Sequence, residues 1–313
     1  MSRKKFDKLP DFLIIGAGKS GTTSVDKYLY QHPQVFVSRL KEPNFFGYEN
    51  ITEADFGGNE EELAHFRISV TSLDKYLALF EDATPGQVIG ETSNTYMYHE
   101  QAPERIKHYI PDVKLIAILR QPALRLYSRY LHLAREDRTP TREFADCLDQ
   151  STIWWQRNDL IREGFYYKNL KRYFELFPKE NIRIYLYEDL QKKPLEVMAD
   201  IYGFLGVDTS FQPDVSLRYN ESGIIKNRTL NKIYGPGGLI SKSLKAVLPG
   251  TLVHKLKDNS SLTRKVMEIR GKNLSKPAID PELKRKLTFE VYGDDIRNLQ
   301  TLIGRDLGHW LNV

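Results

Sequence analysis

A glycine-rich turn near the N-terminus carries residue types that bind anionic groups. Residues 12–33 read FLIIGAGKSGTTSVDKYLYQHP, an apolar segment followed by glycines, a lysine and two threonines. Lys19 supplies a positive charge on a flexible stem. A helix that begins at Thr22 would add the N–H groups of its first turn and the positive end of its dipole. We therefore expect an anionic ligand on this turn.

Two nucleotide-binding patterns overlap on the turn. Gly16, Gly18 and Gly21 match the G-x-G-x-x-G spacing of dinucleotide-binding proteins, which also place an acidic residue about 20 positions later, at the end of the second strand. Here that strand is followed by SRLKE, and Glu42 lies beyond its end. The dinucleotide pattern is therefore incomplete.

The second pattern is the phosphate-binding loop of nucleoside triphosphatases. Gly18, Lys19 and Ser20 resemble its last residues, but the glycine that should stand five residues before Gly18 is replaced by Leu13, inside the strand. The apolar strand LIAILR ends in Arg120 rather than in an aspartate, and only Asp189 offers a substitute. A nucleotide kinase or small NTPase remains the alternative enzyme class.

A third interpretation rests on four segments that together resemble sulfotransferases using 3′-phosphoadenosine-5′-phosphosulfate (PAPS). The segments are KSGTT (19–23), LKEPNFF (40–46), LRQPALRLYSRY (119–130) and LIGRDLGHWL (302–311). The resemblance spans nearly the whole chain and is closest to the bacterial and carbohydrate-acting members. The segment GETSNTY (90–96) lacks the catalytic histidine of the small-molecule branch, so we look for a carboxylate base.

The resemblance implies a fold, a cofactor and a set of site residues. The fold is a three-layer α/β structure, in which helices flank a mostly parallel sheet, of the P-loop NTPase-like sulfotransferase type. The cofactor is PAPS, the product is adenosine 3′,5′-bisphosphate (PAP), and no metal is implied. The implied cofactor-binding residues are Lys19, Ser20, Gly21, Thr22, Thr23, Arg120, Ser128, Lys226 and Arg228.

Two residues are implied to act in the reaction itself. Sulfuryl transfer is an in-line displacement, so catalysis consists mainly of positioning and charge stabilisation. Lys19 would follow the negative charge that grows on the bridging oxygen, and Glu42 would take the proton of the acceptor hydroxyl. Glu91, at the end of a strand, is the competing carboxylate, with a structural hydrogen-bonding role as its alternative.

The other side chains near these segments have simpler expected roles. Arg125 and Arg129 lie on the predicted helix that follows Arg120, and we expect both on a solvated face. Aromatic rings pack against sugars and apolar chains, so five aromatic residues are predicted to line the acceptor cleft. They are Phe45, Phe46, Tyr48, Trp154 and Trp155.

The elements that must position these residues alternate between strand and helix, which indicates βαβ units. Strands are predicted at 12–15, 34–37, 87–92, 113–120 and 181–190, with 113–120 the most apolar and therefore central. Helices are predicted at 22–31, 73–80, 102–109, 122–136, 166–177, 195–205 and 280–302.

We predict a single domain over residues 1–313. Within it, 47–86 is a lid-like insertion, 215–240 a mobile loop and 281–313 a C-terminal helical segment.

Composition limits the functional classes. The 313 residues carry a net charge of +5, which suits an anionic ligand but is too weak to indicate nucleic acid. The one cysteine, Cys147, excludes an internal disulfide. No run approaches the ~20 apolar residues that span a membrane, and we expect a cytoplasmic protein. The acceptor is predicted to be a hydroxyl of a carbohydrate or glycolipid; a nucleotide-binding protein without catalysis is the non-enzyme alternative.

Overall fold

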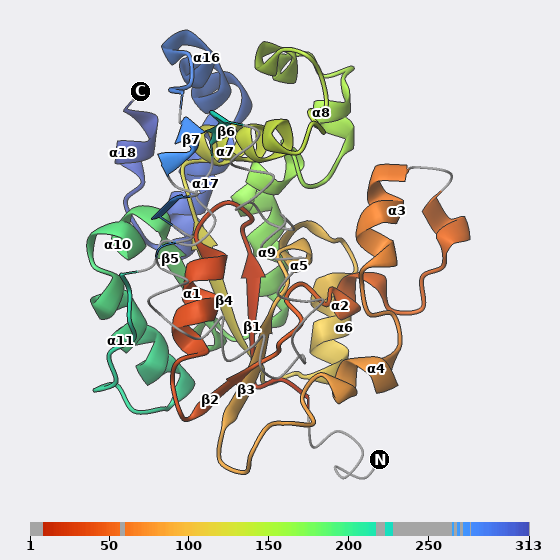
Figure 1. The fold of residues 1–313 in the computed structure, drawn as a ribbon, viewed down its shortest axis with the longest axis vertical. Coiled ribbons are helices and arrows are strands. Elements are labelled where there is room, and N and C mark those ends of the chain that lie inside the picture. Colours follow the sequence, from red (N-terminus) through yellow and green to blue (C-terminus); the bar gives the residue numbers. More distant parts are fainter. Residues whose placement is uncertain are drawn as a thin grey trace.

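A five-stranded parallel sheet forms the centre of the molecule (Figure 1). The computed structural model describes residues 9–56, 60–216, 223–227, 265, 268–269, 272–275 and 277–312. The strands are β1 (Phe12–Gly16), β2 (Val35–Val37), β3 (Val88–Thr92), β4 (Lys114–Leu119) and β5 (Ile182–Leu186), in the spatial order β2-β3-β1-β4-β5. Every pairing is parallel, which confirms the predicted class of sheet.

Helices cover both faces of this sheet, as the three-layer prediction requires. Alternate residues of β1 face two separate cores: Leu13 and Ile15 pack on one side, Phe12 and Ile14 on the other. The first core includes α5 (Thr95–Tyr98), α6 (Ala102–Tyr109), α7 (Pro122–Arg135), α9 (Tyr166–Leu176) and α17 (Gly293–Ile303). The second includes α1 (Thr22–Leu29) and α11 (Pro194–Leu205).

The remaining elements are short. The α-helices are α2 (Phe45–Tyr48), α3 (Glu60–Arg67), α4 (Leu73–Ala78), α8 (Ile153–Gln156), α10 (Tyr187–Lys192), α16 (Pro281–Lys286) and α18 (Gly308–Leu311). Within the described residues, 3₁₀ turns lie at Glu53–Phe56, Phe144–Leu148, Arg162–Gly164 and Lys179–Asn181, and a π-helical turn at Leu287–Val291. β6 (Ile224–Ile225) and β7 (Leu274–Ser275) form an antiparallel ribbon.

Two predicted strands differ from the structure. The segment 181–190 is not one buried strand: β5 ends at Leu186 on the sheet edge, and the chain continues as α10. The apolar strand β4 lies inside the sheet, but β1 occupies the middle position. Apolar content reports burial, and it does not distinguish the middle strand from its neighbour.

The order of the strands creates a site at the carboxyl ends of the strands. The chain leaves β1 toward β2 on one side, whereas β4 pairs with β1 on the other. Ligands of open α/β sheets bind where the strand order reverses in this way, outside the carboxyl ends of the strands. In the described part of the chain, no helix combines the length and apolar character needed to cross a membrane.

Candidate functional site

A cleft of about 540 Å³ opens at the carboxyl ends of the strands. Its walls include four connections: the turn after β1, the segment between β2 and α2, the segment after β3, and α7 with the residues that join it to β4. Residues of α3, of the stretch 159–163 and of α10 also line it. Polar residues that the four connections contribute include Lys19, Thr22, Thr23, Ser24, Lys41, Glu42, Asn94, Thr95, Tyr98, Arg120, Ser128, Arg129 and His132. Four connections distant in the sequence thus converge on one cleft.

The glycine turn is closely packed against α10. Gly21 has φ 97°, in the left-handed region that glycine enters most easily. A Cβ atom there would lie 2.9 Å from Leu190 Cδ2 and 3.2 Å from Tyr187 Cδ2. Helix α1 begins at the next residue, Thr22, so its first turn and the positive end of its dipole adjoin the cleft. The predicted anion-binding geometry is therefore present.

Lys19 lines the cleft at the tip of this turn, also in the left-handed region, with φ 66°. Burial lowers the pKa of its ammonium group to about 7, and the neighbouring charges of Arg129, Arg135, Lys41 and Arg120 add to the effect. An anion bound here would reverse this effect, because it favours the charged form.

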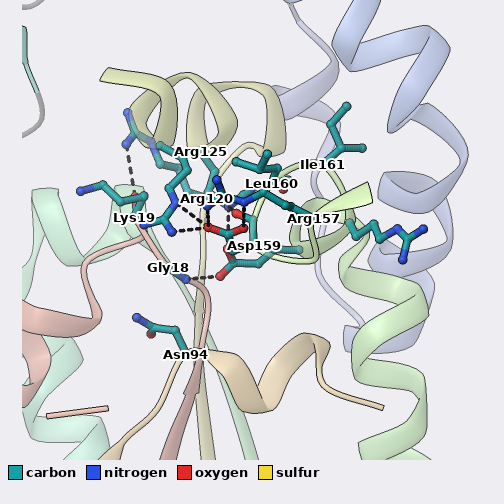
Figure 2. Close-up of polar contacts among 12 residues, drawn as sticks. Gly18, Lys19, Asn94, Arg120, Arg125, Arg157, Asp159, Leu160 and Ile161 are labelled. Carbon is teal, nitrogen blue, oxygen red and sulfur yellow. Dashed lines mark hydrogen bonds and ion pairs between the residues drawn. The ribbon is translucent and has the colours of Figure 1, made fainter. Parts of the chain in front are cut away.

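Arg120 follows the last residue of β4 and reaches the same turn. Its NH1 donates to the carbonyl oxygen of Lys19 at 3.3 Å (Figure 2). Its guanidinium lies 4.8 Å from the ring centre of Tyr187. Burial lowers its pKa. Within the described residues no carboxylate forms an ion pair with Arg120, so this partly buried cation can serve an external anion.

The other predicted cofactor residues divide into three groups. Gly21, Thr22, Thr23 and Ser128 line the cleft together with Lys19 and Arg120. Ser20 is fully buried and is not among the lining residues. Lys226 lies beside the β6–β7 ribbon, exposed, with its ammonium donating to the carbonyl of Lys272 at 3.1 Å. Arg228 lies outside the described residues.

Glu42 stands on the wall formed between β2 and α2. Its backbone has φ 59°, and its N–H donates to the carbonyl of Thr92 at 2.8 Å. Its Oε1 accepts from Asn94 Nδ2 at 2.8 Å and lies 3.5 Å from Lys41 Nζ. The carboxylate is thus held at the cleft by partners from two segments.

The competing carboxylate, Glu91, is fully buried away from the cleft. It accepts hydrogen bonds from Tyr96 at 2.7 Å, Ser93 at 2.8 Å and Tyr76 at 3.1 Å. Burial raises its pKa to about 7 despite these three hydroxyl donors. Its position agrees with a structural hydrogen-bonding role, because Tyr76 on α4 and Tyr96 on α5 both bind it at the end of β3.

Arg125 is not on a solvated face, contrary to the sequence prediction. It is fully buried, and its NH1 lies 2.7 Å from Glu163 Oε2. The other carboxylate oxygen of Glu163 accepts from the backbone N–H of Gly18 at 2.5 Å, so the pair contacts the glycine turn directly. Burial raises the pKa of Glu163 to about 7, and Arg125 opposes that rise.

The prediction for Arg129 is also wrong. Its side chain is only 16% exposed at the cleft and pairs with Asp159. Asp159 also binds Arg157 NH2 at 2.9 Å (Figure 2). Although burial favours the neutral acid, these two arginines hold the pKa of Asp159 well below its usual range. The helix periodicity could not show that residues 157–164 cover this face of α7 with two carboxylates.

The predicted aromatic lining of the cleft is wrong as well. Phe45, Phe46 and Trp154 are fully buried in the core, Tyr48 is almost so, and Trp155 packs against the core with its N–H on the carbonyl of Cys147. The aromatic rings that do line the cleft come from Tyr28, Tyr98 and Tyr187.

Sequence reasoning missed several cleft residues. Lys41 lies inside LKEPNFF and Asn94 inside GETSNTY, but nothing in the spacing of either segment gives these two residues a role. Asp159 and Glu163 belong to the charged, irregular stretch RNDLIREG, whose density of charge was the one available signal. His65 and His132 also line the cleft, and burial lowers both of their pKa values, that of His132 to about 3.

The arrangement suits a ligand with several negative charges and a hydroxyl that loses a proton. Cations and helix N–H groups lie on the turn side, and a carboxylate with an exposed edge lies on the β2–α2 side. No group of three or more His, Cys, Asp or Glu residues that could hold a metal ion occurs in the described part of the chain.

Comparison with known proteins agrees with this geometry. The family model described as "Sulfotransferase family" matches residues 10–212. A sulfotransferase from Alicyclobacillus acidocaldarius has a similar structure, with a TM-score of 0.67 and 26% identity over 96% of this chain and 98% of that one. A mouse sulfotransferase complexed with PAP shares the fold, with a TM-score of 0.51 and 17% identity over 98% and 90% of the two chains.

Curated relatives give the same family. The mouse bifunctional heparan sulfate N-deacetylase/N-sulfotransferase 4 is 28% identical over 228 residues, which are 69% of this chain and 24% of that protein. The chain thus spans about a quarter of the length of such relatives. Because the family model covers well over half of the residues, including the turn, Glu42 and Arg120, the chain belongs to the sulfotransferase family.

Proposed function

We propose that this protein transfers a sulfuryl group from PAPS to a hydroxyl of a carbohydrate or glycolipid acceptor. The observation that carries the proposal is the meeting of three groups in one cleft: Lys19 on the glycine turn, Arg120 at the end of β4, and Glu42 on the facing segment. The family membership and the PAP complex of a mouse protein of the same fold support the choice of donor.

The residues present fit the two ends of this donor. The turn and the start of α1 offer N–H groups and the Lys19 ammonium to a 5′-phosphosulfate. Arg120 and Ser128 line the cleft on the α7 side and would hold the 3′-phosphate. PAPS, when bound, supplies a sulfuryl group on an oxygen that leaves as phosphate.

This chain's own residues would then perform two tasks. Lys19 stabilises the charge that develops on the leaving oxygen, which requires its protonated form. Glu42, fixed by Asn94 and by the Thr92 carbonyl, takes the proton of the acceptor hydroxyl as the new S–O bond forms. Lys226 and Arg228 remain predicted contacts of the nucleotide.

The carbohydrate part of the proposed acceptor is supported by relatives, one of which is named a heparan sulfate N-sulfotransferase; the hydroxyl as the accepting group rests on the carboxylate base proposed at Glu42. The cleft itself offers polar and charged side chains together with the ring of Tyr98, a combination that suits a polyhydroxylated ligand. A cytoplasmic location and a reaction without a metal are parts of the same proposal.

The test is a binding series followed by turnover. We expect PAP to raise the melting temperature, and ADP with Mg²⁺ or NAD to raise it less. With ³⁵S-labelled PAPS and a panel of hydroxyl-bearing glycans and glycolipids, label should pass to at least one acceptor. A larger shift with ADP and Mg²⁺ would favour the kinase alternative. Binding of PAP without transfer to any acceptor would favour the non-catalytic alternative.

A further inference from the structure

Lys41 connects the two halves of the site. Its Nζ donates to Thr23 Oγ1 on the glycine turn at 2.8 Å and lies 3.5 Å from Glu42 Oε1. Thr23 belongs to the donor side of the cleft, and Glu42 to the acceptor side. The two contacts place one ammonium group between the turn and the carboxylate.

The surroundings of Lys41 separate it from an ordinary surface lysine. It lines the cleft, its side chain is 27% exposed, and its charge is one of those that lower the pKa of Lys19. Asn94 also donates to Glu42 Oε1, and at 2.8 Å it is the closer partner. Lys41 is therefore not needed to hold Glu42 in place, and a half-exposed ion pair of this length contributes little to stability.

We propose that Lys41 is a further catalytic residue, which donates hydrogen bonds to the oxygens of the sulfuryl group during transfer. This inference rests on the proposed function. In the step, the bond from sulfur to the 5′-phosphate oxygen breaks and its electron pair stays on that oxygen. A bond from sulfur to the acceptor oxygen forms, and the hydroxyl proton passes to Glu42. Lys41 keeps its protons throughout.

The physical reason is the position of the Lys41 charge relative to the path of the sulfuryl group from the leaving oxygen to the acceptor oxygen. The sulfuryl group travels from an oxygen held by the turn to an oxygen held at Glu42, and Lys41 contacts the residues that mark both ends. A cation already fixed beside the path stabilises the transferring group without reorganisation. Lys19 lies at the leaving-oxygen end, so the two lysines act on different atoms.

The test compares two ligands that differ only in the sulfuryl group. Titration calorimetry without acceptor gives the dissociation constants of PAPS and PAP for wild type, Lys41→Gln and Lys41→Arg. We expect Lys41→Gln to bind PAP within twofold of wild type and PAPS about tenfold more weakly, the scale of a lost charged hydrogen bond. Its kcat should fall ~10²-fold, and Lys41→Arg should recover part of both losses.

Lys27→Gln is the matched control, because Lys27 is exposed on α1 and does not line the cleft. It should behave as wild type. Equal weakening of PAP and PAPS by Lys41→Gln would make Lys41 a nucleotide or structural contact and overturn the inference. An unchanged kcat and an unchanged ratio of the two constants would overturn it as well. A wild type that binds neither ligand would instead overturn the proposed function, and the inference with it.

Discussion

The ammonium group of Lys19 is poised to change charge near neutral pH. Burial and four neighbouring cations lower its pKa to about 7. A bound polyanion favours the charged form and should raise that pKa again. Binding of PAP should therefore take up a proton above pH 7.

We expect PAP affinity to fall as pH rises between about 7.5 and 9.5, approaching tenfold per unit, because free Lys19 must first be protonated. The ligand's phosphates are already ionised in this range. Calorimetry in two buffers of different ionisation enthalpy measures the proton directly. Lys19→Met should bind more weakly and without proton uptake; equal uptake by that variant would assign the proton to another group.

Arg120 makes a second prediction at this scale. Because this partly buried cation has no carboxylate partner within the described residues, Arg120→Ala should weaken PAP binding by roughly 1.5–3 kcal/mol, the scale of a charged hydrogen bond. Adenosine 5′-phosphosulfate, which lacks the 3′-phosphate, should be affected much less. Equal losses for the two ligands in parallel titrations would contradict the assignment.

Glu42 carries the prediction about the base. Glu42→Gln keeps the size of the side chain but cannot accept the proton, so turnover should fall ~10²-fold or more while PAP binds as in wild type. Glu91→Gln serves as the comparison, since Glu91 is buried away from the cleft. An inactive Glu91→Gln beside an active Glu42→Gln would show that the base is assigned to the wrong carboxylate.

At the scale of single residues, the sequence led to the turn, Arg120, Ser128 and Glu42, because each belongs to a short segment with local spacing. It did not lead to Glu163 or Asp159, which meet α7 only through the folding of an irregular stretch. The burial of Arg125 and Arg129 follows from that packing, and helix periodicity does not encode it. Lys226 lies beside the ribbon, and its contact with the nucleotide stays a prediction.

At the scale of elements, Glu91 is the point where β3, α4 and α5 are joined. Tyr76 from α4 and Tyr96 from α5 both donate to its Oε1. This contact ties the segment 47–86 to the sheet, and whether that segment acts as a lid stays a prediction. Because the carboxyl is fully buried, its protonation is coupled to folding.

The pH dependence of that coupling has a definite sign. The pKa of Glu91 is about 7 in the folded protein against an ordinary value of 4.5, so the folded state retains this proton while the unfolded state loses it. The stability that Glu91 contributes is therefore largest below pH 4.5 and falls as pH rises toward 7. The amount is about 3 kcal/mol at most.

Glu91→Gln should remove this dependence, because the amide does not titrate. The free energy of unfolding of the variant minus that of wild type, measured by urea denaturation, should rise by about 2–3 kcal/mol between pH 4.5 and 8. A constant difference over this range would mean that Glu91 is ionised throughout.

Most elements could be predicted because their signals are local. The predicted helix 102–109 coincides with α6, and Pro122 begins α7, where the side chain of Gln121 accepts from the N–H of Leu124 at 2.8 Å. The error at 181–190 arose because an apolar run continues through a change of element. Leu190 is buried on a helix as completely as it would be on a strand.

At the scale of the whole molecule, the C-terminal helix is built into the support of the site. Trp310 is buried, its N–H donates to Glu188 on α10 at 2.6 Å, and its carbonyl accepts from Gln121 at the start of α7. Helix α10 also carries Tyr187, the ring over which Arg120 lies. Helix α10 and the start of α7, which both lie beside the proposed nucleotide site, thus both bind Trp310.

Trp310→Ala should destabilise the protein by about 3–5 kcal/mol, the cost of deleting a buried aromatic side chain. PAP affinity should also fall, because α10 and the start of α7 lose a common contact. Chemical denaturation and a PAP titration measure the two effects. Trp310→Phe keeps most of the packing and should lose far less stability; equal losses for both variants would place the effect in the N–H···Glu188 bond.

The class of fold was accessible from the alternation of apolar strands with helices, and the family from four short segments. The position of β1 in the middle of the sheet was not, because strand order depends on which faces the helices cover. The roles assigned to residues 47–86 and 281–313 stay predictions, and the predicted loop 215–240 lies largely outside the described residues.

At Lys19 and Glu42 the left-handed backbone lowers the stability of the fold, while the side chains are proposed to act in the reaction. That conformation costs a residue with a side chain roughly 1–2 kcal/mol, and glycine largely avoids the cost. A screen for more stable variants would therefore be drawn to these two positions, where glycine relieves the backbone and, at Lys19, also removes a poorly solvated charge. Each such gain would delete a group proposed for the chemistry, so engineering for robustness must hold both positions constant.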